Sequence, residues 1–400
     1  MKPWYRAFYR AISGMYFDRI SVLCRERLPG GGPVIYVAMH RNGAVDGFVY
    51  GTLLPRAEFM LSGQLTGNWF SRLFFDGFTV LREKDEPDAA TRKTYNLRTL
   101  TRCADHVLQG GELVVFPEGT SSLGPRHLPI KSGAAHLVAQ CMDEGVVPAV
   151  VPLGIHYERA WAFRSRVEVV VGEAIDIRLP DDMPPRRRTV ELKRQMTRAL
   201  ESVSANFDSG KAQRQAEQLA CIATLGTDAA YFDSLKRMEG GLPICDGWEA
   251  IERELEGSGA FRYQDVPLFP TGSTWLYALY GLILIPIVAT AAVANCVPLL
   301  GAWLAGKTLA DDNNVISLWR ILVGTPLLAI WGIGWLSVSL ALGQALLFPA
   351  YLLVSWLGGK TWYRLKKLGC AVGNALFHRR FRDQALEQYS FLLNQLTGKK

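Results

Sequence analysis

Two long apolar stretches without a charged residue constrain this chain more than any other feature. Residues 275–306 and residues 321–359 contain no Asp, Glu, Lys or Arg. A helix of about 20 apolar residues crosses a bilayer, and both stretches are longer than that. Each is expected to be either one tilted span with a broken end or a re-entrant hairpin. Prolines that permit a break occur in both stretches, at positions 286, 298, 326 and 349.

The remainder of the chain has the charge density of an ordinary globular protein. The formal net charge is +7, which suits an anionic lipid surface or a phosphorylated substrate. No nucleic-acid-binding signature occurs in the sequence, so no nucleic-acid partner is predicted. The seven cysteines form no CxxC pair and the histidines show no ligand spacing, so neither a disulfide framework nor a metal site is expected. Residues 1–10 lack the apolar core of a cleavable signal peptide.

Residues 28–180 alternate between strand-like and helix-like segments. Short β-branched runs bounded by turn residues predict buried strands, and longer runs with helical spacing predict helices. The predicted strands are residues 33–39, 112–116, 147–154 and 167–171, and the predicted helices are residues 89–109 and 131–144. Strands that alternate with helices indicate an α/β domain with a largely buried sheet.

Four further regions flank this predicted α/β domain. Residues 1–27 have the pattern of an amphipathic helix that either lies on an anionic membrane or packs on its own domain. Residues 181–270 are expected to form a helical connector or substrate cap, and residues 271–359 a C-terminal α-helical membrane domain. Residues 360–400 form a basic tail, which the positive-inside tendency places in the cytoplasm.

The α/β domain is expected on the same cytoplasmic side as this tail, which makes the chain an integral membrane protein with an even number of crossings. Two or four crossings fit the apolar stretches, and none is needed if both stretches are hairpins. A bacterial inner membrane and an endoplasmic reticulum fit equally well.

The first motif with chemical content is HRNGAVD at residues 40–46, directly after a predicted buried strand. The carboxylate of Asp46 can accept a hydrogen bond from one ring nitrogen of His40, fix the tautomer and raise the basicity of the other nitrogen. His40 and Asp46 are therefore candidates for a general-base pair. Most lone histidines are structural, so this assignment depends on the surrounding motifs.

A second motif, FPEGTSS at residues 116–122, also follows a predicted strand. Gly119 and the hydroxyl residues after it, beginning with Thr120, expose backbone N–H groups that suit a phosphate or an oxyanion. Glu118 cannot bind a phosphate, but it can hold the hydroxyls of an acceptor or orient a basic residue. Taken alone, the motif is a turn with a carboxylate.

Together the two motifs resemble those of the glycerolipid acyltransferase family, in which a His–Asp pair is followed by FPEG with Thr or Gly and then Ser. Five residues separate His40 from Asp46, whereas the family usually has four. The wider spacing, HxNxxxD, is similar to the fungal-type branch that acylates glycerol-3-phosphate or dihydroxyacetone phosphate. The resemblance covers about residues 30–175, with a weaker likeness as far as NVISLWR at residues 314–320. It implies a glycerolipid-acyltransferase-like α/β domain.

The same resemblance implies a site for the phosphate of the acceptor. GFTVLR at residues 77–82 is similar to the family's second motif, in which the arginine, here Arg82, meets that phosphate. Ser121 stands where many relatives have an arginine, and Lys131, in a run similar to the LPLKxG of the fungal-type branch, is expected to supply the missing charge. Residues 146–152 resemble the fourth motif, a strand that lines the acyl-side cleft, and equally fit a plain core strand.

The implied activity is transfer of a fatty acyl group from acyl-CoA or acyl-carrier protein to a hydroxyl of glycerol-3-phosphate, without a further cofactor. His40, held by Asp46, is expected to remove the proton of the attacking hydroxyl. No cysteine or serine sits in a nucleophile elbow, so no covalent acyl-enzyme is required. A lysophosphatidate or other lysolipid acyltransferase is a close alternative. A non-catalytic, membrane-anchored lipid-binding or scaffold protein is the alternative of another class, and the intact motifs weigh against it.

Overall fold

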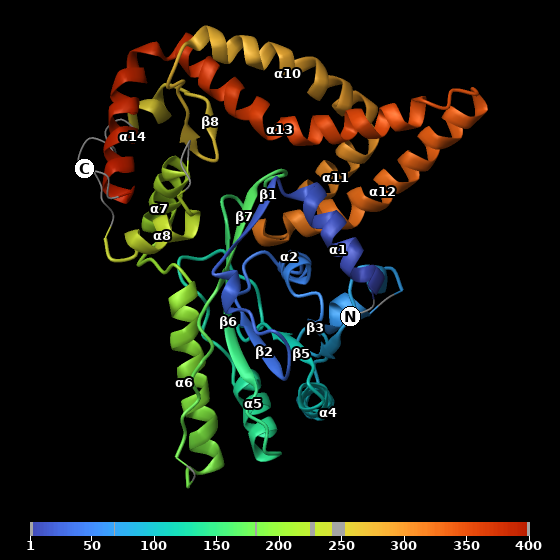
Figure 1. The fold of residues 1–400 in the computed structure, drawn as a ribbon, viewed down its shortest axis with the longest axis vertical. Helices are drawn as coiled ribbons and strands as arrows, with labels where there is room; N and C mark the ends of the chain where they lie inside the picture. The colour runs from blue at the N-terminus through green and yellow to red at the C-terminus, as the bar shows by residue number, and fades with distance from the viewer. Residues whose placement is uncertain (1–2, 68, 181, 225–228, 242–252, 398–400) are drawn as a thin grey trace. The chain divides into compact units, whose positions relative to one another are not determined.

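The computed structural model divides the chain into two compact units (Figure 1). It describes all residues except 1–2, 68, 181, 225–228, 242–252 and 398–400, so Cys245 and parts of the expected connector lie outside the described residues. Unit 1 comprises Met1–Gly14, Ile20–His156 and Val167–Asn206. Unit 2 comprises Met15–Arg19, Tyr157–Arg166 and Phe207–Lys400.

A seven-stranded sheet organises the first part of the chain. Its strands, in spatial order, are β1 (Arg19–Leu23), β7 (Arg166–Val171), β6 (Ala149–Tyr157), β2 (Val34–Ala38), β5 (Glu112–Val115), β3 (Glu58–Ser62) and β4 (Phe78–Val80). Strand β2 pairs in parallel with β5 and β6, and β3 pairs in parallel with β5 and β4. Every residue of β2 and β5 is buried, as expected for central strands covered on both faces. The α/β class and the four predicted strands are confirmed.

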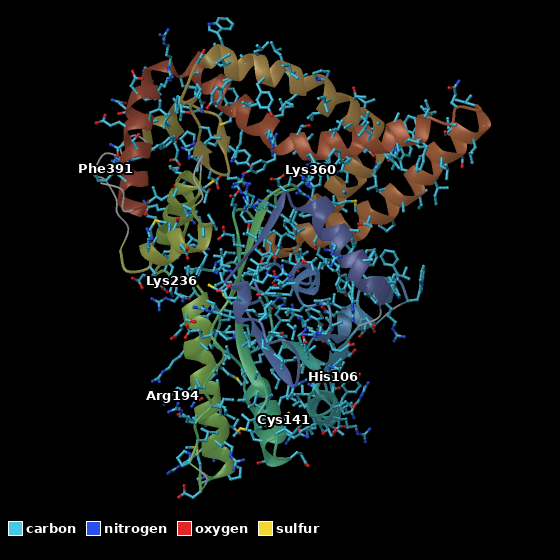
Figure 2. All side chains as sticks on the ribbon, in the orientation of Figure 1. His106, Cys141, Arg194, Lys236, Lys360 and Phe391 are labelled. Atoms are coloured by element: carbon cyan, nitrogen blue, oxygen red, sulfur yellow. The ribbon has the colours of Figure 1, made fainter. Side chains whose placement is uncertain are left out.

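The first part of the chain also contains several α-helices. They are α1 (Pro3–Tyr16), α2 (Val45–Leu53), α3 (Gly63–Thr66), α4 (Ala89–Leu108), α5 (Gly133–Asp143) and α6 (Pro185–Val203). Asp88 caps α4 by accepting a hydrogen bond from the N–H of Thr91 at 2.7 Å. Helices α5 and α6 lie side by side (Figure 1), and Figure 2 shows Cys141 on α5 and Arg194 on α6.

The prediction of one helix over residues 1–27 is wrong. Helix α1 ends at Tyr16, and Arg19–Leu23 then forms the edge strand β1. Ile20 and Val22 are β-branched and favour a strand, and pairing with the sheet outweighs the helical pattern. Of the two expectations for α1, the structure shows packing on its own domain. The ring of the buried Tyr9 lies 5.1 Å from that of Phe48 on α2.

Unit 2 is mostly helical. Its elements are α7 (Gly210–Ala223), α8 (Tyr231–Met238), a small hairpin of β8 (Arg262–Tyr263) and β9 (Val266–Pro267), α10 (Thr274–Ala294), α11 (Cys296–Thr308), α12 (Asn313–Ala341), α13 (Leu347–Phe377) and α14 (Arg382–Thr397). Two predicted boundaries are displaced. Helix α6 belongs to unit 1 rather than to a separate connector, and α13 runs without interruption across the expected boundary at residue 359. The described part of the expected tail is therefore mostly helical.

Both apolar stretches are broken, but not at the prolines named above, since Pro286 and Pro326 lie inside α10 and α12. The first breaks at Asn295, between α10 and α11, and the second breaks at residues 342–346, between α12 and α13. Helix α10 lies beside α13, and α11 lies beside α12 (Figure 1). A polar contact holds the first pair, because Asn295 Nδ2 donates to Ser355 Oγ at 2.8 Å and Tyr351 Oη donates to Asn295 Oδ1 at 2.8 Å. Helices α10 and α12 are long and apolar enough to cross a membrane.

Candidate active site

His40 and Asp46 are in direct contact at the carboxyl end of β2. Nδ1 of His40 lies 2.9 Å from Oδ2 of Asp46. The carboxylate is completely buried, whereas the imidazole is 17% exposed. Because Nδ1 is engaged by the carboxylate, Nε2 is the ring nitrogen left to accept a proton. The ring of Phe116 stacks on the imidazole at a centroid distance of 4.5 Å and limits its rotation.

The loop between the two residues closes around the carboxylate. Oδ2 of Asp46 also accepts hydrogen bonds from the backbone N–H groups of Arg41, at 2.7 Å, and Asn42, at 2.9 Å. Gly43 makes the turn possible with a φ of 52°, in the left-handed region. Asp46 lies in the first turn of α2, where the helix dipole favours an anion. The wider spacing in this motif therefore does not prevent the His–Asp contact.

Glu118 holds two segments of the site together. Its Oε1 accepts a hydrogen bond from the backbone N–H of His40 at 3.0 Å, and its Oε2 accepts one from the N–H of Leu128 at 2.9 Å. The side chain is only 3% exposed. Burial raises the pKa of Glu118, and the two backbone hydrogen bonds and the positive charges of His40 and Arg41 oppose that rise. Of the two roles expected for Glu118, this geometry fits the orientation of a basic residue.

Lys131 lies against Gly119. A Cβ atom on Gly119 would be 2.7 Å from Nζ of Lys131, and Gly119 has a φ of +74°. The backbone N–H of Lys131 donates to the carbonyl of Pro117 at 2.8 Å, which folds the residues after the FPEG turn back onto it. The N–H of Ser122 donates to the carbonyl of His40 at 3.0 Å. The structure thus brings Lys131, Gly119 and His40 into one connected group.

Arg82 lies at the same edge of the sheet, farther along it. It follows β4 as His40 follows β2, and these strands run in the same direction through β5 and β3. Three strand spacings separate β2 from β4, or about 14 Å. Nη2 of Arg82 donates to Oε1 of Gln64 at 2.7 Å, and Nε lies 3.5 Å from Oδ2 of Asp85. Thr120, also expected in the site, is exposed on the loop after β5.

Sequence reasoning gave no role to two aromatic residues that shape the site. Phe116, the first residue of the second motif, packs on His40. Tyr50 is completely buried on α2, and its Oη lies 3.3 Å from the carbonyl oxygens of both Met39 and Leu153. Burial raises the pKa of Tyr50, and the negative charge of Asp46 raises it further. The four-residue spacing of Tyr50 from Asp46, one helical turn, was the available signal.

The described residues include no group of three or more His, Cys, Asp or Glu side chains that could hold a metal ion. Two buried thiols lie on the helices of the same unit. Burial raises the pKa of Cys103 to about 12 and that of Cys141 to about 11, so both thiols are protonated near neutral pH.

Comparisons with known proteins agree on the type of domain. Residues 3–156 match the family model described as Acyltransferase. The chain is 37% identical over 122 residues to glycerol-3-phosphate O-acyltransferase 2 of Saccharomyces cerevisiae, covering 28% of this chain and 16% of that protein. It is 31% identical over 111 residues to glycerol-3-phosphate O-acyltransferase 1 of the same yeast, covering 27% of this chain and 14% of that protein. The aligned region is thus a small fraction of either yeast protein.

A solved structure also resembles the chain: the 1-acyl-sn-glycerophosphate (LPA) acyltransferase PlsC from Thermotoga maritima, with a TM-score of 0.35 and 20% identity over 50% of this chain and 79% of that one. The sheet, the His–Asp pair and the family model together define an acyltransferase-type α/β domain. Over residues 3–156 the chain is thus similar to acyltransferases of the glycerolipid type.

Proposed function

We propose that this chain transfers a fatty acyl group from an acyl thioester, acyl-CoA or acyl-carrier protein, to a hydroxyl of glycerol-3-phosphate. The observation that carries the proposal is the contact of 2.9 Å between Nδ1 of His40 and the buried carboxylate of Asp46. The names of the two yeast relatives favour glycerol-3-phosphate as the acceptor. The basic side chains at the same sheet edge suit its phosphate.

In the proposed reaction, Nε2 of His40 removes the proton of the acceptor hydroxyl as its oxygen attacks the thioester carbonyl. Asp46 stabilises the imidazolium that forms. The new C–O bond replaces the C–S bond, and the proton passes from His40 to the departing thiolate, which leaves as a thiol. Lys131 and Arg82 bind the phosphate of the acceptor, and backbone N–H groups near Gly119 stabilise the oxyanion.

Glu118 acts as a positioning residue in this mechanism. Its carboxylate is buried and both oxygens accept backbone hydrogen bonds, so it supports the loop of His40 rather than the acceptor. Glu118 is therefore not among the groups proposed to bind the phosphate. Those groups are the basic residues and the exposed backbone of the turn after β5.

An acceptor assay tests the proposal. Purified full-length protein in detergent is given a labelled acyl-CoA or acyl-carrier protein with glycerol-3-phosphate, dihydroxyacetone phosphate or lysophosphatidate. Acylation of glycerol-3-phosphate that is lost in His40→Ala supports the proposal. Acylation of lysophosphatidate alone would assign the chain to lysolipid acceptors, and activity that survives in His40→Ala would remove the general-base role. If no acceptor is acylated, the chain would instead be a lipid-binding or scaffold protein.

A further inference from the structure

Three cations from distant parts of the sequence gather in unit 2, and two of them contact one tryptophan. Arg159 belongs to the segment Tyr157–Arg166, and its guanidinium lies over the ring of Trp161, 5.0 Å from the centroid. Arg320, on α12, donates from Nη1 to the carbonyl oxygen of Trp161 at 2.7 Å. Two guanidinium groups from distant parts of the sequence therefore meet at the same residue.

Lys366, on α13, completes the group. Lys366 is exposed, and its pKa is lowered by partial burial and then by the positive charges of Arg159 and Arg320. Trp362 lies one helical turn before Lys366 on the same face of α13, and its ring is 6.3 Å from that of Phe163. This contact directs that face of α13 toward the segment that carries Arg159. Three like charges held together repel one another unless an anion neutralises them.

The protein supplies little negative charge here. Among the described residues, Asp265 forms an ion pair with Arg159, and no carboxylate pairs with Arg320 or Lys366. Within the same described part of the chain, Nε of Arg320 is buried without a hydrogen-bond partner. The group therefore carries a positive excess at Arg320 and Lys366.

A neighbouring pair of cations in unit 2 has a buried carboxylate beside it. Arg166 and Lys367 both lie over the ring of Tyr363, at 4.8 Å and 4.5 Å from its centroid. The buried carboxylate of Glu158 lies 3.8 Å from Arg166 and 3.4 Å from the hydroxyl of Tyr363. Each set of cations therefore has one carboxylate beside it, which leaves the larger positive excess on the group of Arg159, Arg320 and Lys366.

The three cations lie at the base of the apolar arm formed by α12 and α13. The rings of Trp335 and Tyr351 stack at 5.1 Å and fix the relative height of the two helices. Arg320 is fifteen residues before Trp335, and Lys366 is fifteen residues after Tyr351. Both cations are therefore about 22 Å from the stacked pair, measured along their helices. Residues 321–359 between them contain no charge. With this arm in hydrocarbon, its base lies at the depth of lipid headgroups.

We propose that Arg159, Arg320 and Lys366 bind the phosphate of an anionic phospholipid headgroup. Guanidinium and ammonium groups suit phosphate oxygens, and the adjacent Trp161 and Trp362 are of the residue type that favours the membrane interface. The bound phosphate, together with Asp265, offsets the positive charge of the three cations. This site consists of residues of unit 2 and does not depend on the acyltransferase activity proposed above.

The test uses the full chain in an uncharged detergent and measures its melting temperature. Dioctanoyl phosphatidic acid, dioctanoyl phosphatidylcholine and inorganic phosphate are titrated separately. The variants are Lys366→Gln and Arg159→Gln. Arg320 is left intact, because it also holds the carbonyl of Trp161. Lys360→Gln is the matched control, since Lys360 is an exposed lysine on the same helix (Figure 2).

Phosphatidic acid is expected to raise the melting temperature, whereas phosphatidylcholine and inorganic phosphate at the same concentration are not. Lys366→Gln and Arg159→Gln should each raise the apparent Kd for phosphatidic acid about tenfold, the effect of one lost charge-assisted contact. Lys360→Gln should leave that Kd unchanged, and so should Lys131→Gln, which alters the candidate active site.

Three results would overturn the proposal. An equal loss of affinity in Lys360→Gln and Lys366→Gln would mean diffuse attraction rather than a site. Equal stabilisation by inorganic phosphate would mean a free anion rather than a lipid. Loss of the effect in Lys131→Gln would place the bound lipid in the active site.

Discussion

The carboxylate of Glu118 accepts a hydrogen bond from the backbone N–H of His40 at 3.0 Å. The FPEGTSS motif thus holds the backbone of the HRNGAVD motif, although 78 residues separate His40 from Glu118 in sequence. A change at Glu118 should therefore act on His40 through its position, without contact with a substrate.

Glu118→Gln removes one of two hydrogen-bond acceptors. The amide oxygen can replace one carboxylate oxygen, but the amide nitrogen then faces a backbone N–H of His40 or Leu128. We expect the free energy of unfolding to fall by about 1–3 kcal/mol and the rate of acyl transfer to fall with it. Thermal unfolding and the acceptor assay measure the two effects. Unchanged stability would show that the buried contacts are replaced by others.

The same variant predicts a pH dependence. The folded protein raises the pKa of Glu118, so it binds a proton more tightly than the unfolded chain does. The stabilisation from this proton is complete below the ordinary pKa of glutamate, about 4.3, and is lost as the pH rises through the higher folded value. The stability of the wild type relative to Glu118→Gln should therefore decrease over this window. Melting temperatures of both proteins from pH 4 upward test the sign, and an increase would contradict it.

His40→Ala should separate chemistry from folding. His40 is partly exposed and packs on one ring, so its loss should reduce kcat by about 10²–10⁴-fold with little change in melting temperature. Asp46→Asn should lower both kcat and the melting temperature, because the buried Oδ2 of Asp46 accepts hydrogen bonds from three donors. Measurement of kcat and melting temperature for both variants checks this. A His40→Ala variant with nearly normal kcat would exclude the general base.

Gly119→Ala and Gly110→Ala form a matched pair. Both glycines have positive φ, +74° and +83°, so each substitution carries a backbone cost of about 1–2 kcal/mol. Only the new methyl at position 119 meets a neighbour, Nζ of Lys131 at 2.7 Å, whereas position 110 faces open space. The KM for glycerol-3-phosphate should therefore rise in Gly119→Ala alone. If the two variants have the same KM, Lys131 does not bind the acceptor.

Arg82→Ala should raise the KM for glycerol-3-phosphate more than it changes kcat. The reason is that Arg82 lies along the sheet edge from His40 and is expected to contact the phosphate and not the reacting hydroxyl. Arg102→Ala is a useful control, since Arg102 lies over the ring of Phe78 in β4, 5.6 Å from its centroid. Initial rates over a range of acceptor concentrations give both constants. If only kcat falls, Arg82 does not bind the phosphate of the acceptor.

Cys103 and Cys141 should resist alkylation in the folded protein. Both are fully buried and burial raises their pKa, so neither presents a thiolate near neutral pH. Cys24 is partly exposed and serves as the reactive control. Mass spectrometry after treatment with N-ethylmaleimide, with and without denaturant, identifies the modified residues. Rapid modification of Cys141 in the folded state would show that this thiol is reactive enough to act as a nucleophile.

Local patterns were sufficient to predict the central sheet and the His–Asp pair. Strands β2 and β5 are continuous apolar runs, and His40 and Asp46 belong to one loop, so sequence proximity determines their contact. The contact of Lys131 with Gly119 was not predictable, because it depends on a left-handed glycine and on a loop that folds back on itself.

The failure at β1 has a different cause. Residues 19–23 have apolar spacing compatible with a helix, and only pairing with a strand far along the chain makes them the sheet's edge. Arg159, Arg320 and Lys366 were missed for the same reason. Each is an ordinary basic residue in sequence, and only the tertiary fold brings them together.

The shared direction of β2, β5, β3 and β4 has a consequence for how such an enzyme could change its substrates. The groups proposed to meet the acceptor are carried by the loops after β5 and β4, which lie along one margin of the sheet, while β2 and β5 stay buried. A turn such as residues 81–88 can lengthen, shorten or exchange a side chain without disturbing its neighbours. Acceptor preference can therefore diverge among descendants of one ancestor while the proton-transfer pair stays fixed.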